Sequence, residues 1–167
     1  MKYFSPILEL IHSFMGMIIL LWAYARPASS SMKKIAGIRL TADAEYSADH
    51  GSHLNEVCEA MLLLERVDIE SFELIKKHIR VIFLLSIGVE CTYLPIGKIC
   101  ILNLTGKSDE DKLIKIAGFL VSCATYSRLS GPIKFYLSQH QENAKRVSQV
   151  EKRRVIEKLK AATTHPA

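Results

Sequence analysis

The stretch Ile114-Lys-Ile-Ala-Gly-Phe-Leu-Val-Ser-Cys-Ala124 is apolar except at Lys115, Gly118 and Ser122. A helix that is apolar on all sides is normally buried in a protein core. We therefore expect this stretch to form a central helix on which the rest of the domain packs. Ser108 is a suitable N-cap for it, and Ser130-Gly-Pro132 is expected to end it.

Upstream of this helix, the chain alternates between strand-like and helix-like patterns. Residues 35–40 read as a short strand, and residues 52–66 carry the broad apolar face of a helix. Asp68 can cap a second helix that reaches residue 79, in which apolar residues recur at helical spacing. Residues 81–104 contain two β-rich runs separated by glycine and proline, which predicts a hairpin.

These elements together predict one α+β domain over residues 32–167, mostly helical, with a short β-hairpin and strands packed on the buried central helix. The domain follows an N-terminal segment, residues 1–31, that contains an apolar run at 6–25. Twenty helical residues span roughly 30 Å, the thickness of a bilayer core. The fold class therefore includes an N-terminal apolar helix that is predicted to be transmembrane.

The N-terminal segment has three interpretations. As a single-pass anchor, it leaves more basic residues on its C-terminal side, which places the domain in the cytoplasm by the positive-inside rule. As a signal peptide cleaved after Ala25, it would direct export. If the chain starts at Met32, the protein would be cytoplasmic. The membrane anchor is our leading prediction.

Residues 132–162 predict a long basic helix that closes the domain. Its bases outnumber its acids by five, which equals the net charge of +5 for the whole chain. We expect this helix to contact an anionic partner, either lipid headgroups or nucleic acid, or alternatively a protein partner. No aromatic residue follows Tyr136, which disfavours stacking on single-stranded bases. The alternative is a solvated face on which acids at helical spacing balance the bases. The predicted contact residues are Lys145, Arg146, Lys152, Arg153 and Arg154.

The cysteines do not form a recognisable pattern. The four cysteines at 58, 91, 100 and 123 lie in apolar sequence, and none belongs to a CxxC pair. We expect buried free thiols, with Cys91 and Cys100 as the first pair to test if the protein is exported. Cys123 is expected to be an inert core thiol rather than a nucleophile.

A polar segment before the first predicted helix offers weak metal-ligand candidates, His50, His53 and Glu56. Only His53 and Glu56 have helical spacing, and a polar loop with two solvated histidines is the preferred interpretation. No catalytic motif is intact in the sequence, and we expect neither a cofactor nor a bound metal.

The central helix carries one resemblance, in Ala117-Gly-Phe-Leu-Val-Ser-Cys-Ala-Thr-Tyr-Ser-Arg-Leu129. It resembles a group of small, largely uncharacterised bacterial proteins built like minimal zinc metallopeptidases, whose central helix reads Leu-Val-His-Glu-Ala-Thr-His-Ala-Arg. The likeness extends from about residue 54 to 155 and includes Leu64-Glu-Arg-Val-Asp68, Tyr93-Leu-Pro95 and the run from Lys98 to Leu104.

The resemblance implies a zinc site that this chain has lost. In His-Glu-x-x-His, two histidines four residues apart bind zinc and the glutamate activates water. The corresponding positions here are Ser122, Cys123 and Tyr126, so the resemblance implies a degenerate, non-catalytic scaffold. The alternative is chance similarity between apolar helices.

Three functions are consistent with the sequence. The first is a non-enzymatic, membrane-associated binding protein on this degenerate scaffold. The second is a metal-dependent hydrolase that uses His50, His53 and Glu56. The third is a soluble nucleic-acid-binding protein that uses the basic helix.

Overall fold

The computed structural model describes residue 14 and residues 33–42, 52–85, 91–94, 97–104, 111–134 and 138–164, without the side chains of 130–141. These residues form an α+β domain with the element order β1 (Lys33–Ile35), β2 (Ile38–Ala42), α3 (Ser52–Val67), α4 (Ile69–His78), β3 (Val81–Leu84), β4 (Cys91–Leu94), β5 (Ile99–Leu102), α5 (Lys112–Lys134) and α6 (Ser138–Thr164). The α+β class and the predominance of helix are confirmed.

The strands form one mixed sheet in the order β1-β2-β3-β5-β4. The two outer pairs, β1–β2 and β4–β5, are antiparallel, whereas β2–β3 and β3–β5 are parallel. In register, Arg39 faces Val81 and Val81 faces Ile99. The three parallel strands therefore begin at the same edge of the sheet.

Two predictions about the strands are corrected. The single strand expected over 35–40 is a hairpin, because Ala36 and Gly37 adopt the positive φ angles of a two-residue turn, 49° and 82°. The hairpin expected across 81–104 joins only β4 to β5, through Gly97 and Lys98, both with positive φ. β5 lies between β3 and β4 and runs parallel to β3.

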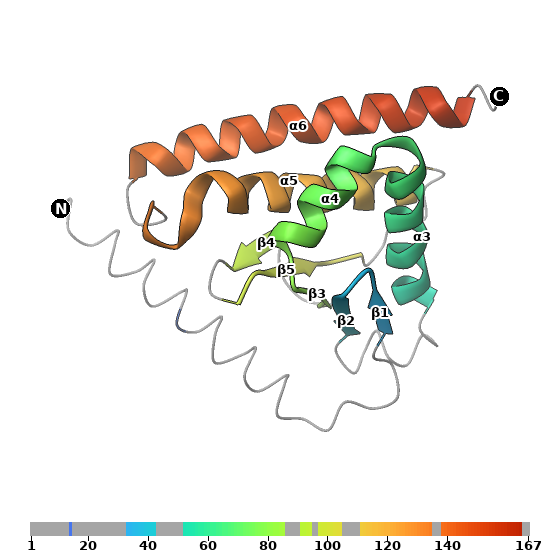
Figure 1. Cartoon of the computed structure of the whole chain (residues 1–167), viewed down its shortest axis with the longest axis horizontal. Helices are drawn as coiled ribbons and strands as arrows, with labels where there is room; N and C mark the ends of the chain where they lie inside the picture. The colour runs from blue at the N-terminus through green and yellow to red at the C-terminus, as the bar shows by residue number, and fades with distance from the viewer. Residues whose placement is uncertain are drawn as a thin grey trace.

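The helices are stacked on the sheet, with α5 between the sheet and α6 (Figure 1). The predicted burial of the central helix is confirmed, since Ile116, Ala117, Leu120 and Ala124 are almost completely buried. The predicted helices at 52–66 and after Asp68 match α3 and α4. Residue 108, the predicted N-cap of α5, lies outside the described residues.

The end of α5 differs from the prediction. The helix continues through Ser130-Gly-Pro132 to Lys134, and α6 begins at Ser138 instead of at 132. Pro132 lacks the N–H that would bond to the carbonyl of Arg128, and α5 ends within a turn of it.

Among the described residues, no helix has the length and apolar character needed to cross a membrane. The predicted anchor over residues 6–25 lies outside the described residues, apart from Phe14.

Candidate functional site

The positions predicted to correspond to the zinc-binding motif, Ser122, Cys123 and Tyr126, lie on α5 where it packs on β4. Ser122 and Cys123 are buried, and Tyr126 is half-buried with its ring edge against Tyr93. The two ring centroids are 6.4 Å apart, with an interplanar angle of 76°. The Tyr93 hydroxyl also lies 2.5 Å from Ser127 Oγ on α5. These contacts fix the position of α5 over this end of the sheet.

The same interface brings three cysteines together. Cys91 on β4, Cys100 on β5 and Cys123 on α5 place their sulfur atoms within 4.8 Å of one another, and we call these residues the thiol cluster. Cys91 Sγ and Cys123 Sγ are 3.1 Å apart. Cys100 and Cys123 are buried, whereas Cys91 is half-buried.

Sequence reasoning singled out Cys91 and Cys100 as a possible pair but missed the third member, Cys123, and with it the cluster. No spacing signal reveals it, because it depends on the β4–β5 pairing and on the docking of α5. The remaining cysteine, Cys58, lies on α3 outside the cluster, and all four are free thiols.

The electrostatic environment favours protonated thiols in the cluster. Hydrogen bonding with the neighbouring thiols, together with burial, raises the pKa of Cys100 well above its ordinary value. The Cys100 thiol by itself lowers the pKa of Cys123, but the Cys91 thiol and burial raise it well above its usual range. A protonated thiol is a poor nucleophile. The protonated thiols are therefore not activated to attack a substrate, and a metal ion that bound them would have to displace their protons.

Lys152 from α6 lies beside the cluster. Its Nζ is 3.6 Å from the centroid of the Phe119 ring, and the Cys91 thiol points toward the Phe119 carbonyl oxygen at 4.0 Å. The positive charge of Lys152 acts to lower the pKa of Cys123. Lys152, predicted from sequence as a contact for an anionic partner, thus packs within the domain.

Two of the weak metal-ligand candidates, His53 and Glu56, contact the side chain of Lys112. His53 Nδ1 lies 2.8 Å from Glu56 Oε2, and Lys112 Nζ lies 2.7 Å from Glu56 Oε1. Partial burial alone would raise the pKa of Glu56, but hydrogen bonds from Lys112 and His53 hold it below its ordinary value. The ammonium group of Lys112 occupies the place where a cation would bind. His50 lies outside the described residues.

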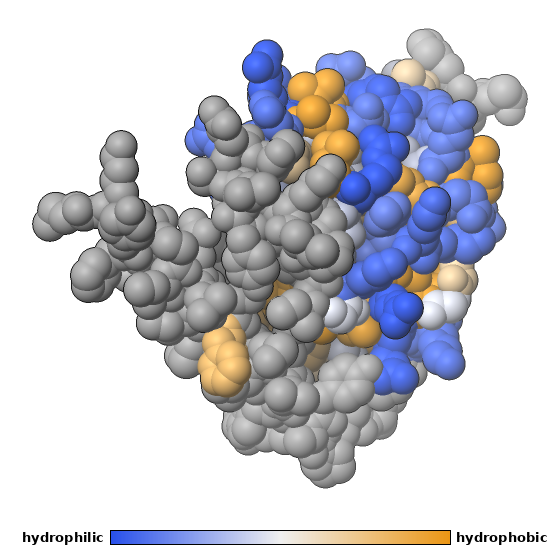
Figure 2. All heavy atoms as spheres, turned by 60° about the vertical axis from the view of Figure 1, so that its left-hand side comes forward, coloured by the Kyte–Doolittle hydropathy of each residue, from blue (hydrophilic) through white to orange (hydrophobic). Residues whose placement is uncertain are grey.

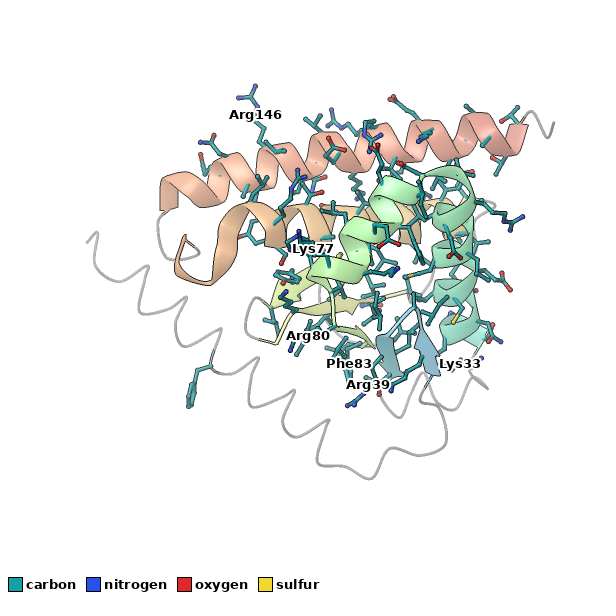
Figure 3. The ribbon with its side chains drawn as sticks, viewed as in Figure 1. Lys33, Arg39, Lys77, Arg80, Phe83 and Arg146 are labelled. Carbon is teal, nitrogen blue, oxygen red and sulfur yellow. The ribbon has the colours of Figure 1, made fainter. Side chains whose placement is uncertain are left out.

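The basic residues of α6 divide into two groups. Arg154 pairs with Glu151 and with the buried Asp68, which also accepts from Lys158. In contrast, the exposed residues Lys145, Arg146 and Arg153 make no ion pair with the described part of the chain. Arg146 points away from the molecule (Figure 3). Of the five predicted contact residues, these three are exposed without an ion pair to the described residues, whereas Arg154 is exposed but ion-paired.

A second group of cations, which sequence reasoning missed, gathers at the edge where the parallel strands begin. Arg39 N donates to the Arg80 carbonyl, Arg80 N donates to the Lys98 carbonyl, and Lys98 Nζ donates to the Lys77 carbonyl at the end of α4. We call Arg39, Lys77, Arg80, Lys98 and Arg128 the cationic edge. Figure 3 shows Arg39, Lys77 and Arg80 at this end of the sheet.

The pKa of His78 responds to the positive charges of this edge. Burial, followed by the positive charges of Lys98, Lys77 and Arg128, lowers its pKa. Every charged group that shifts His78 is thus a cation. The Tyr93 hydroxyl donates to the His78 carbonyl, which ties the edge to the sheet. Lys77, Arg80 and Arg128 have no ion-pair partner among the described residues. A concentration of unpaired cations is typical of a surface that binds anions.

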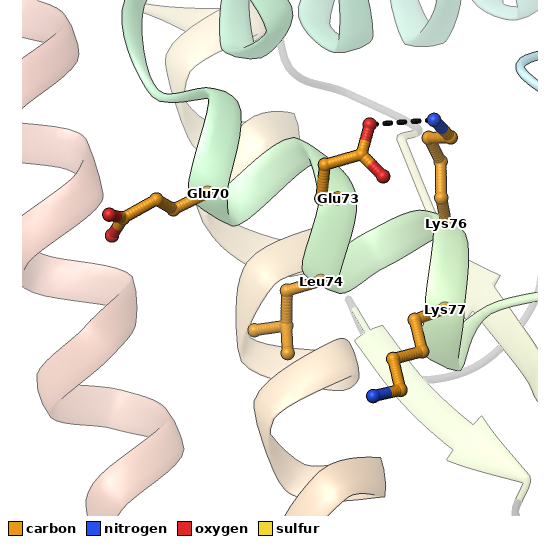
Figure 4. A pocket seen from close by; sticks show the side chains of 5 residues that line it. All are labelled: Glu70, Glu73, Leu74, Lys76 and Lys77. Carbon is orange, nitrogen blue, oxygen red and sulfur yellow. Dashed lines mark hydrogen bonds and ion pairs between the residues drawn. The ribbon is translucent and has the colours of Figure 1, made fainter.

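A shallow hollow of about 450 Å³ lies along α4, lined by Glu70, Glu73, Leu74, Lys76 and Lys77 (Figure 4). Glu73 and Lys76 pair across it at 2.6 Å. In the face shown in Figure 2, hydrophobic residues are interrupted by hydrophilic ones. Such a surface favours contact with a charged partner over binding of a small apolar ligand.

Comparisons with protein families, with characterised proteins and with solved structures found no match to this chain.

Proposed function

We propose that this chain is a non-enzymatic binding protein that associates with the anionic surface of a membrane. The observation that carries the proposal is the cationic edge, in which hydrogen bonds link the backbones of Arg39, Arg80 and Lys98, and the Lys98 side chain to the Lys77 carbonyl, while Lys98, Lys77 and Arg128 all act on His78. Basic residues near an anionic leaflet contribute about 1 kcal/mol each. The apolar run at residues 6–25 supports the same location from the sequence, since an anchor would hold the domain at the cytoplasmic leaflet.

The proposal includes the degenerate metallopeptidase-like scaffold. Its support is the sequence likeness around Ser122, Cys123 and Tyr126, none of which supplies the histidine or glutamate of the zinc motif. Packing of these positions against β4 is compatible with an architectural role.

The test removes two positive charges from the cationic edge. The experiment uses residues 32–167, because this fragment contains every described strand. The fragment and its Lys77→Gln/Arg80→Gln variant are each sedimented with phosphatidylcholine vesicles that contain or lack phosphatidylserine. We expect the variant to bind the anionic vesicles about 30-fold more weakly, from two charges of about 1 kcal/mol each. Binding should also weaken with salt.

A matched control removes the same charge from the outer face of α6. Lys145→Gln/Arg146→Gln changes the net charge equally, and both residues are exposed. Little loss of binding is expected. If this control abolishes binding and the edge variant does not, the partner contacts α6 and the proposed surface is wrong. Tighter binding to a DNA or RNA oligonucleotide than to the vesicles would favour the nucleic-acid alternative.

The anchor is tested separately in the full-length protein. We expect the full chain to remain with membranes after extraction at alkaline pH, and residues 32–167 to be released. Extraction of both proteins would contradict the anchor while leaving the cationic edge to be judged by the vesicle assay.

A further inference from the structure

The thiol cluster has the composition of a metal site that none of the functions above uses. Three sulfur ligands converge from β4, β5 and α5, with all pairwise separations within 4.8 Å. Ligands around a metal at a metal–sulfur distance of about 2.3 Å lie roughly 3.8–4.0 Å apart. The observed separations therefore require only small side-chain movements to surround one ion.

We propose that Cys91, Cys100 and Cys123 bind a single Cu(I) ion in three-coordinate sulfur geometry. Thiolates select soft ions such as Cu(I). Structural zinc sites almost always have four ligands, and no other histidine, cysteine, aspartate or glutamate of the described residues joins this group. A three-sulfur set thus suits Cu(I) better than Zn(II).

The residues around the thiol cluster allow an ion to enter and place a positive charge next to the thiolates. Cys91 is half-buried, so an ion can reach the cluster through it. Lys152 brings a positive charge next to the site, where it offsets the negative charge of the bound thiolates. Each cysteine that becomes a thiolate ligand releases one proton to solvent, so the affinity for Cu(I) should rise with pH.

The first experiment is an anaerobic titration of the full-length protein with Cu(I) in competition with a chromogenic chelator. We expect one Cu(I) per chain, with thiolate-to-copper charge-transfer absorption in the near ultraviolet. We expect each of three variants, Cys91→Ser, Cys100→Ser and Cys123→Ser, to weaken Cu(I) binding by at least about 10–100-fold. A loss of this size is typical when only a group that hydrogen-bonds to a metal ligand is altered, and these variants remove a ligand itself. Cys58→Ser is the matched control and should bind as the wild type does.

A second measurement needs no variant and is unaffected by misfolding of a mutant. Iodoacetamide is added to the wild-type protein with and without Cu(I), and alkylation is read cysteine by cysteine by mass spectrometry. Cu(I) should slow the alkylation of Cys91 and leave the alkylation rate of Cys58 unchanged. Cys58 is a suitable control because both cysteines are half-buried in the metal-free protein.

Three results would overturn the proposed site, and a fourth would overturn the choice of metal. The first is equal Cu(I) affinity in the cluster variants and the wild type. The second is equal protection of Cys58 and Cys91. The third is a Cys91–Cys123 disulfide that forms by exchange with oxidised glutathione, which is reduced to two molecules of glutathione, in a buffer that also contains an excess of reduced glutathione; it would assign the short Cys91–Cys123 contact to redox chemistry. Four-coordinate Zn(II) by X-ray absorption would replace the Cu(I) assignment. The vesicle assay uses different residues, so the two proposals fail independently.

Discussion

At the scale of single residues, Asp68 shows how one side chain serves the tertiary structure. It was predicted as an N-cap, and it does precede α4, yet its side chain makes no capping hydrogen bond. The buried carboxylate instead accepts from Ser71 Oγ at 2.8 Å and pairs with Lys158 and Arg154 of α6. It therefore ties the α3–α4 junction to α6.

We expect Asp68→Asn to lower the free energy of unfolding by about 1–2 kcal/mol at neutral pH, because charge-assisted bonds to Ser71, Lys158 and Arg154 are lost. Burial alone would raise the pKa of Asp68, but Ser71 and Lys158 hold it below its ordinary value. A lowered folded-state pKa stabilises the fold above the unfolded-state pKa of about 4, and this contribution disappears as pH falls through the folded-state pKa.

Urea unfolding at several pH values measures this effect. The difference between wild type and Asp68→Asn should shrink as the pH is lowered below about 4. Asp111→Asn is the control, because Asp111 also pairs with α6, through Lys160, but is partly exposed. We expect it to change stability by at most about 1 kcal/mol. A constant difference for Asp68→Asn across this range would show that its charge is not what stabilises the junction.

At the scale of elements, the α5–α6 packing depends on Gly118. A β-carbon at this position would lie 2.8 Å from Ile156 Cγ1 and 3.3 Å from Lys152 Cγ, both on α6. We expect Gly118→Val to lower the free energy of unfolding by about 1–3 kcal/mol through overpacking. Ile156→Ala removes the clashing atoms, so the double variant should be less destabilised than the sum of the single variants, as measured by chemical denaturation. An additive double variant would mean that the helices do not meet at this point.

At the scale of the whole molecule, the thiol cluster joins parts of the chain that are far apart in sequence. Its ligands come from two strands and from the central helix, so a bound ion would hold the sheet to α5. A ligand that binds only the folded state stabilises it by about 2.7 kcal/mol at 100 times its dissociation constant. We expect Cu(I) to raise the urea midpoint of the wild type, with a smaller shift for Cys100→Ser. Equal shifts would indicate that copper acts outside the cluster.

The sequence by itself determined the elements whose signals are local. Apolar residues at helical spacing predicted α3 and α4 almost to their ends, and the apolar run at 114–124 predicted the buried α5. These predictions succeed because helix formation depends on residues three or four apart. The prediction that the central helix ends at Ser130-Gly-Pro132 was wrong, because α5 continues past Pro132 to Lys134.

Only the tertiary structure decided the strand order and both candidate sites. β3 pairs with β2 and β5 but not with β4, the next strand in sequence, and nothing in the strand sequences specifies that choice. This pairing sets Arg80 beside Lys98, while the pairing of β4 with β5 and the docking of α5 bring the three cysteines together. Likewise, the fold decided which basic residues of α6 pair with Asp68, namely Arg154 and Lys158, and which make no ion pair with the described residues. Long-range contacts of this kind have no periodic signature, because they depend on how whole elements dock.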